Sequence, residues 1–264
     1  MASTTLPQYS ARPPAIPGIT WACDVKSERV NWLWQYRLAV GEINEIISDE
    51  GMGKSCVGAR ITADATRGKL DGQNGVGFRV LVVAHEDSWT HTVKPRLQAA
   101  GADMNAVGFL QYPSDDGLRP VIFPDDTEYV RDAMSQGRAG MLYVDPLGSH
   151  IAAQRNSFDP DQIRIAVRPL AEAAHVDKFT VLDNRHTNRS TSTNARQRSA
   201  GSLGYRQATR LQMIFGRDPD APEDDTRRML VGSKANISAK ARALRIKMET
   251  VSVDLEDGTT DEII

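Results

Sequence analysis

The residues from Ser48 to Ser55 have the types and the spacing of a loop that binds phosphate. Their sequence, SDEGMGKS, matches the last three positions of the pattern G-x-x-x-x-G-K-[ST], and Ser48 stands in place of the first glycine. In such loops the backbone N–H groups and the N-terminus of the following helix form a nest for an anion. The pattern places Lys54 on the β- and γ-phosphate oxygens and the Ser55 hydroxyl on Mg²⁺. We therefore predict a nucleotide site formed by Ser48, Asp49, Glu50, Gly51, Met52, Gly53, Lys54, Ser55 and Cys56.

Three residues of this loop depart from the usual chemistry of a phosphate site. Serine is less permissive than glycine in its backbone conformation, so Ser48 restricts the turn. Asp49 and Glu50 place negative charge beside the phosphates. The competing interpretation is a glycine turn that caps a helix, with Lys54 in contact only with solvent.

The segments around the loop alternate between strand and helix, and this order predicts the fold. Apolar, β-branched runs predict strands over Glu42–Ile47, Phe78–Ala84, Val107–Gln111, Met141–Val144 and Phe179–Leu182, and helical spacing covers Lys54–Arg67, Trp89–Ala100, Asp126–Gln136 and Pro160–Ala174. This alternation implies βαβ units. We therefore expect an α/β fold in which helices flank a mainly parallel central sheet.

The pattern changes after Asn184. Residues Thr187–Ala200 are polar and low in complexity, which predicts a long loop. Three further strands are expected over Leu211–Phe215, Met229–Gly232 and Leu244–Met248, at the spacing of hairpins. They fit an antiparallel extension at the edge of the sheet. We find no internal repeat.

The composition is that of an ordinary globular protein, and it excludes several classes. The chain of 264 residues holds 32 Lys and Arg against 34 Asp and Glu, and this balance excludes a protein that binds DNA through bulk positive charge. Two cysteines exclude a disulfide framework and indicate a reducing compartment. No apolar run approaches the roughly 18–20 residues that span a bilayer. We expect a cytoplasmic protein that does not contact the membrane.

Motifs along most of the chain resemble those of the RepA-type, RecA-like AAA ATPases of plasmids, phages and integrated elements. The resemblance rests on Trp32-Leu33-Trp34, Gly41-Glu42, Gly51-Met52-Gly53-Lys54-Ser55, Ala84-His85-Glu86-Asp87, Lys94-Pro95-Arg96-Leu97, Tyr143-Val144-Asp145-Pro146-Leu147, Arg185-His186-Thr187-Asn188-Arg189-Ser190 and Gly216-Arg217-Asp218-Pro219-Asp220. It covers about Val25 to Glu249. It implies a RecA-like P-loop NTPase, similar to the motor domain of ring helicases, with ATP and Mg²⁺ as cofactors.

This resemblance divides the chain into three expected parts. Residues 1–20 hold four of the 13 prolines and no apolar region of a signal peptide, and we expect a flexible leader. Residues 21–249 are the expected RecA-like ATPase domain. Residues 250–264 are the expected acidic tail, because the chain from Glu249 onward holds six acidic residues and no basic one.

The resemblance also assigns carboxylates at the ends of two strands. Asp145 follows the strand Met141–Val144, where a carboxylate can hold a water of the Mg²⁺ shell. A turn aspartate before Pro146 is the alternative. Glu86 would orient and deprotonate the attacking water, and Asp87 is the alternative base.

Two further residues have roles that only the resemblance implies. His186 would report the state of the γ-phosphate to the loop that faces DNA. However, Asp183 and Asn184 stand where the family has apolar residues, so either the strand ends early or its end faces the site. Lys234 would reach the γ-phosphate of a neighbouring subunit and stabilise charge in the transition state. A solvated hairpin lysine is the alternative for Lys234.

Arginines predict a surface for a polynucleotide. From Asn184 to Arg217 the chain holds seven arginines and no acidic residue. The resemblance implies that the loop after the fifth strand lines a channel and contacts single-stranded DNA through Arg189, Arg196 and Arg198, and that Gly148–Ser157 is a second channel loop with Arg155. Without aromatic residues such a loop would contact phosphates rather than stack on bases. A solvated arginine face is the alternative.

Together these features predict a Mg²⁺-dependent ATP hydrolase that assembles as a homo-oligomer, a hexameric ring. It would act on single-stranded DNA as a replication helicase or related motor of a mobile element. A catalytically weakened regulatory or loader module stays open, because Ser48, Glu50 and Asp183-Asn184 depart from the family pattern. A P-loop kinase is the third interpretation, against which the position of Glu86 and the antiparallel C-terminal strands argue.

Overall fold

The computed structural model describes residue 13 and residues 15–152, 160–187 and 203–264, and it divides the chain into two compact units. The first unit, Met1–Val30, contains the short 3-10 turn η1 (Ala22–Asp24), and its side chains Ile16, Ile19 and Val25 are exposed. The second unit, Asn31–Ile264, holds all the strands of the described chain. Within the described residues no helix is long and apolar enough to cross a membrane.

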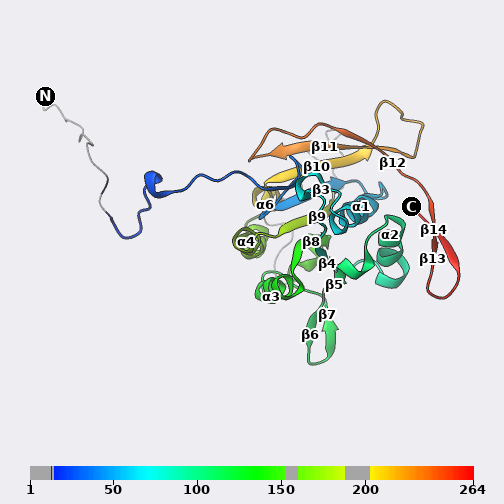
Figure 1. The fold of residues 1–264 in the computed structure, drawn as a ribbon, viewed down its shortest axis with the longest axis horizontal. Coiled ribbons are helices and arrows are strands. Elements are labelled where there is room, and N and C mark those ends of the chain that lie inside the picture. The colour runs from blue at the N-terminus through cyan, green and yellow to red at the C-terminus, as the bar shows by residue number, and fades with distance from the viewer. Residues whose placement is uncertain (1–12, 14, 153–159, 188–202) are drawn as a thin grey trace, which may run out of the picture. The chain divides into compact units, whose positions relative to one another are not determined.

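An eight-stranded sheet forms the centre of the second unit (Figure 1). In sequence order its strands are β3 (Ile43–Ser48), β4 (Arg79–Ala84), β5 (Val107–Phe109), β8 (Ala139–Asp145), β9 (Thr180–His186), β10 (Leu211–Arg217), β11 (Arg227–Ala235) and β12 (Leu244–Lys247). Their spatial order is β12-β11-β10-β3-β9-β8-β4-β5. The six strands from β10 to β5 are parallel, and β11 and β12 are antiparallel to their neighbours. The predicted α/β fold with a mainly parallel sheet is confirmed.

The late strands differ in one respect from the expectation. β10 pairs parallel to β3, with Leu211 opposite Asn44 and Phe215 opposite Ser48, so the antiparallel extension begins only at β11. A parallel partner needs a crossover connection, whereas β10 and β11 are joined directly as a hairpin. Two antiparallel strands, not three, therefore extend the sheet at this edge.

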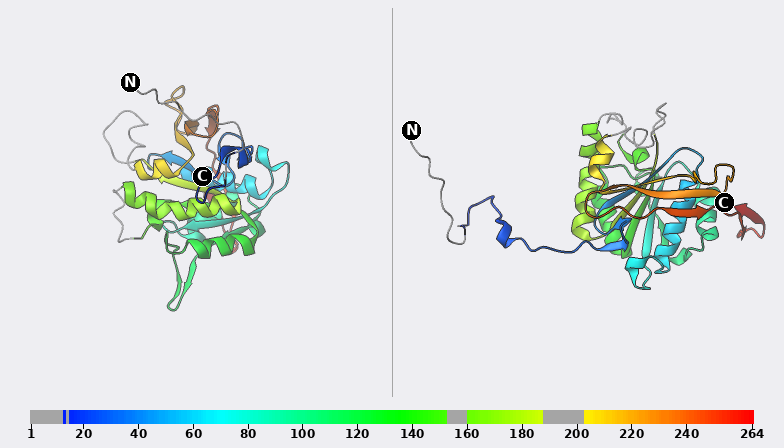
Figure 2. Two further views of the ribbon diagram at one scale, coloured as in Figure 1. Left: turned by 90° about the vertical axis from the view of Figure 1, so that its left-hand side faces the viewer. Right: turned by 90° about the horizontal axis from the view of Figure 1, so that it is seen from above.

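Helices cover both faces of the sheet (Figure 2). Two helices lie on one face of the sheet, α1 (Lys54–Thr66) and α2 (Lys94–Ala99), and α2 follows a π-helical turn at Trp89–Val93. Three helices lie on the other face, α3 (Thr127–Gly137), α4 (Pro160–Asp177) and α6 (Leu203–Ala208). The two hydrophobic cores lie between these layers. On α4 an apolar stripe formed by Ile163, Val167, Leu170 and Ala174 is fully buried.

Short elements complete the unit. They are the pairs β1 (Trp32–Trp34) with β2 (Leu38–Ala39), β6 (Tyr112–Ser114) with β7 (Gly117–Arg119) and β13 (Val251–Asp254) with β14 (Thr260–Ile263), and the 3-10 turns η2 (Asp71–Gln73), η4 (Met104–Ala106) and η5 (Leu147–His150). The β13–β14 hairpin occupies the segment expected as an acidic tail. It contacts α2, and Glu256 pairs with Lys94 at its side.

Candidate functional site

The loop between β3 and α1 has the backbone of an anion nest. Gly51 and Gly53 have φ angles of 75° and 87°, which glycine adopts without steric cost. Ser48 is not among the non-glycine residues with positive φ, so a side chain at the position of the usual first glycine causes no strain. A Cβ atom on Gly53 would lie 2.8 Å from Met248 Cε, the end of a flexible side chain that can shift, so the positive φ rather than lack of space requires glycine here.

A cavity of about 310 Å³ lies beside this loop, where the carboxyl ends of β3, β4, β8 and β9 meet. It is lined by Asp49, Gly51, Met52, Gly53, Lys54, Ser55 and Cys56 of the loop, by Ala84, Glu86 and Asp87 after β4, by Val93, Arg96 and Leu97 near α2, and by Tyr143, Asp145 and His186. Seven of the nine predicted nucleotide-binding residues thus line the cavity. Ser48 is buried at the end of β3 and Glu50 is exposed, and neither lines it.

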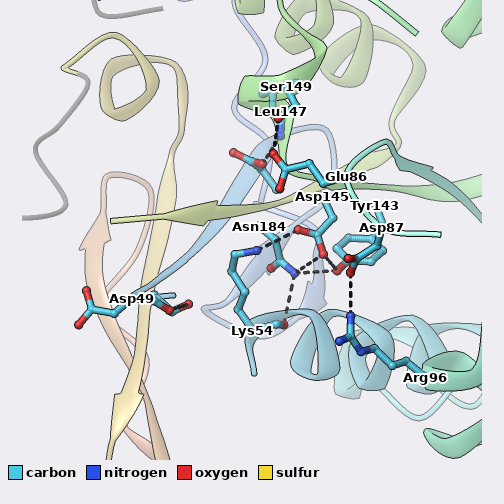
Figure 3. Close-up of polar contacts among 12 residues, drawn as sticks. Asp49, Lys54, Glu86, Asp87, Arg96, Tyr143, Asp145, Leu147, Ser149 and Asn184 are labelled. Carbon is cyan, nitrogen blue, oxygen red and sulfur yellow. Dashed lines mark hydrogen bonds and ion pairs between the residues drawn. The ribbon is translucent and has the colours of Figure 1, made fainter. Parts of the chain in front are cut away.

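Lys54 and Asp145 form an ion pair inside this cavity (Figure 3). Their side chains are 7% and 12% exposed, and Lys54 Nζ lies 3.1 Å from Asp145 Oδ1. The other carboxylate oxygen accepts a hydrogen bond of 2.6 Å from the Tyr143 hydroxyl. Burial, together with the nearby charge of Asp145, raises the pKa of Tyr143 well above its ordinary value, so the phenol keeps its proton.

The donor set of the cavity fits Mg²⁺. A carboxylate (Asp145) and a hydroxyl (Ser55) both line it, and hard oxygen ligands of this kind suit that ion. No group of three or more metal-binding side chains occurs among the described residues. Mg²⁺ commonly binds through one or two protein ligands, with substrate phosphates and water as its other ligands. A small set of protein donors therefore fits Mg²⁺ better than it fits an ion whose ligands all come from the protein.

The two carboxylates after β4 have different partners. Glu86 Oε1 accepts a hydrogen bond of 2.5 Å from the Ser149 hydroxyl, which belongs to η5. Asp87 pairs with Arg96 of α2 at 2.8 Å. Arg96 was not assigned a role from the sequence, although it stands within one of the motifs that carry the resemblance. Asp87 is therefore held in an ion pair with a cation, whereas the contact of Glu86 is with a neutral hydroxyl group.

His186 lies at the end of β9 and lines the cavity. Its Nδ1 atom is buried and has no hydrogen-bond partner among the described residues. Burial is the main cause that lowers the pKa of His186, and the charge of Lys54 lowers it further. The imidazole is therefore neutral at pH 7 and can accept or donate a hydrogen bond to a group that enters the cavity.

Strand β9 does not end early, so the second interpretation of Asp183 and Asn184 is the correct one. Asn184 faces α1 and the site, where its amide lies 3.3 Å from both the Lys54 carbonyl oxygen and Asp145 Oδ2. Asp183 faces the other side of the sheet and accepts the Leu147 N–H at 2.8 Å. Burial, with the charge of Glu45 second, raises the pKa of Asp183 to about 7.

Lys234 does not line the cavity of its own chain. It pairs in register with Gln212, which stands opposite Glu45 and not at the loop end of the sheet. Its ammonium group donates to the carbonyl oxygens of Arg206 and, at 2.6 Å, of Thr209. Burial lowers the pKa of Lys234. The four predicted DNA-binding residues Arg155, Arg189, Arg196 and Arg198 lie outside the described residues.

Comparisons with known proteins agree with this geometry. A family model described as an AAA domain matches residues 12–192. The solved structure of a DnaB-like replicative helicase, described with its interactions with primase, matches 78% of this chain at a TM-score of 0.56 and 12% identity. The chain covers 56% of that helicase, and the likeness is one of fold. No curated protein sequence matches. The chain therefore belongs to the AAA domain family, as a P-loop NTPase with a RecA-like sheet.

Proposed function

We propose that this protein is a Mg²⁺-dependent ATPase that assembles as a hexameric ring and acts on single-stranded DNA as a replicative helicase or related motor of a mobile element. One observation carries the proposal: Lys54, Glu86, Asp145 and His186, from four different segments, line one cavity beside a phosphate-type loop. Lys54 would provide a cation for the phosphates and Asp145 a carboxylate for Mg²⁺. Glu86 would provide a general base, and His186 a neutral imidazole.

The residues divide the work of hydrolysis between them. Lys54 would leave Asp145 and neutralise the β- and γ-phosphates, while Ser55 and Asp145 would hold Mg²⁺. The bound ion would offset negative charge that develops on the phosphate oxygens. Glu86 would accept a proton from the attacking water, with Ser149 fixing its carboxylate. His186, with its free buried nitrogen, would contact the γ-phosphate.

The role of Lys234 in the proposed ring requires a neighbouring subunit. Lys234 does not line the cavity of its own chain, so it would have to leave the carbonyl oxygens of Arg206 and Thr209 and reach the nucleotide of another subunit. The similarity in fold to a DnaB-like replicative helicase supports the same arrangement and supports DNA as the partner. Arg155, Arg189, Arg196 and Arg198 are the residues that we propose for phosphate contacts with the strand.

Turnover and assembly test this function together. We expect the wild type to hydrolyse ATP, to elute as an oligomer, and to respond to single-stranded DNA in a salt-sensitive way. Lys54→Ala should abolish hydrolysis, whereas Lys240→Ala, a change of the same type at an exposed residue, should not. Tight ATP binding without turnover, even by the oligomer with DNA, would instead identify a regulatory or loader module.

A further inference from the structure

Tyr143 and Asn184 both contact the carboxylate of Asp145 on the side away from Lys54 (Figure 3). The Tyr143 hydroxyl donates to Asp145 Oδ2 at 2.6 Å, and Asn184 Nδ2 lies 3.3 Å from the same oxygen. The asparagine amide also donates to the tyrosine oxygen at 2.7 Å. The three side chains form a closed triangle of contacts. Oδ2 is thereby engaged, and Oδ1 is the oxygen that meets Lys54.

A glycine in α1 makes room for this triangle. A Cβ atom on Gly58 would lie 2.2 Å from the Tyr143 hydroxyl oxygen and 2.8 Å from Asn184 Nδ2, far inside van der Waals contact. The helix that follows the phosphate loop therefore approaches both polar groups closely. Gly58, Tyr143 and Asn184 come from α1, β8 and β9 and fit one another as a set.

Burial shows that these two residues act on Asp145 rather than on solvent. Tyr143 is 3% exposed and Asn184 is fully buried. Burying a hydroxyl or an amide costs free energy unless its polar atoms are hydrogen-bonded. The Tyr143 hydroxyl donates to Asp145, and Asn184 Nδ2 has the Tyr143 oxygen, the Lys54 carbonyl oxygen and Asp145 Oδ2 as acceptors, whereas Asn184 Oδ1 has no partner among the described residues. The contact with the Lys54 carbonyl oxygen ties the carboxylate to the first residue of α1. The direction of Asp145 Oδ1 is therefore fixed relative to the phosphate loop.

We propose that Tyr143 and Asn184 are positioning residues that hold Asp145 Oδ2, so that Oδ1 stays directed at the phosphate loop after Lys54 has moved to a phosphate. The inference rests on the proposed function, in which Asp145 and Ser55 hold Mg²⁺. A ligand that is already oriented binds a metal more tightly because it loses less conformational freedom on binding. Removing a hydrogen-bond partner of a metal ligand typically weakens metal binding by roughly 10–100-fold.

The test is the binding of a non-hydrolysable ATP analogue, measured by calorimetry during a Mg²⁺ titration. For Tyr143→Phe we expect an affinity in EDTA within about twofold of the wild type, and a Mg²⁺ midpoint raised by about tenfold. Asn184→Ala should shift the midpoint in the same direction. Tyr129→Phe is the matched control, because it loses one hydrogen bond of 2.8 Å, to the Gln111 carbonyl oxygen, away from the cavity.

Several results would overturn the inference. One is a Mg²⁺ midpoint of Tyr143→Phe equal to that of Tyr129→Phe. Another is an equal loss of affinity for the analogue by Tyr143→Phe with and without Mg²⁺, which would indicate a merely structural role. A third is a wild-type affinity for the analogue that does not change with Mg²⁺. If Tyr143→Phe does not fold, Asn184→Ala carries the test alone, because it removes the other contact of the same carboxylate oxygen and should raise the midpoint. A wild type that binds Mg²⁺ and the analogue but never hydrolyses ATP defeats the proposed function, while the midpoints still decide the positioning.

Discussion

Strand β9 carries polar side chains on both of its faces, and the two groups are built differently. On the α1 face, Asn184 and His186 adjoin a cavity with room for a ligand. On the opposite face, Arg185 pairs with Glu45 of β3, and its guanidinium lies 5.1 Å from the Tyr205 ring of α6. Gln212 of β10 donates to the same glutamate at 2.8 Å.

This difference separates groups that can respond to a ligand from groups that serve the folded state. The cavity side keeps incomplete hydrogen bonding, such as at His186 Nδ1, which has no partner within the part of the chain that the structure describes and which a bound phosphate would satisfy. The Glu45–Arg185 pair is 0% and 9% exposed and has no open side. Polar groups on the two sides of the sheet therefore contribute to different properties, and each variant below should change either turnover or stability and leave the other unchanged.

The largest effect is expected on the cavity side, from Glu86→Gln. Removing a general base typically lowers the rate by about 10²–10⁴-fold. We expect kcat for ATP to fall by that amount, with melting temperature and nucleotide affinity close to those of the wild type. The control is Glu172→Gln, which removes an exposed ion pair with Arg168 on α4 and should keep full turnover. Normal kcat in Glu86→Gln would transfer the role of base to another residue, with Asp87 the first to test.

The opposite face should respond in stability. Arg185→Leu leaves the Glu45 carboxylate buried without its cation, which costs about 3–5 kcal/mol. Urea unfolding should show a free energy lower by this amount. The control Arg164→Leu breaks an exposed pair with Asp161 and should cost about 1 kcal/mol or less. Equal losses in the two variants would show that the buried pair contributes no more than a surface pair.

A pH series sharpens the same comparison. Asp183 has a pKa raised to about 7, so its contribution to stability is present at low pH and is lost as pH rises through 7. Asp183→Asn cannot lose a proton and keeps an oxygen for the Leu147 N–H. Relative to the wild type, it should therefore gain on the order of 2 kcal/mol of unfolding free energy between pH 5 and pH 8. Parallel stability curves for the two proteins would contradict this assignment.

The smallest effect is expected from Ser149→Ala, which frees the Glu86 carboxylate without removing it. A hydrogen bond to a charged group at an accessible site is worth about tenfold or less in rate. Turnover should fall by that factor, with unfolding free energy unchanged. Ser238→Ala provides the control, at a half-buried serine whose hydroxyl donates to the carbonyl oxygen of the adjacent Ala239. A loss as large as that of Glu86→Gln would mean that Ser149 contacts the reacting groups itself.

Local pattern was sufficient to predict most of the fold and the core of the site. The alternation of strands and helices, the phosphate loop and the polar ends of β4 and β8 are properties of short stretches of sequence, because periodicity and loop chemistry are local. The departures at Asp183 and Asn184 were visible in the sequence as well. Which of the two residues faces the site was not visible there, because successive side chains of a strand point to opposite faces and only the packing of α1 shows which face carries the cavity.

The contacts that complete the site were decided only by the tertiary structure. Tyr143 and Asn184 are 41 positions apart, and Gly58 is more than 80 positions from Tyr143, yet the three meet because α1, β8 and β9 pack together. The same holds for Arg96 with the cavity and for the hairpin β13–β14 on α2. A sequence specifies which residues can bind phosphate or carry charge. The packing of distant elements decides that Tyr143 and Asn184 both contact Oδ2 of Asp145. This packing is so close that a methyl group on Gly58 would not fit.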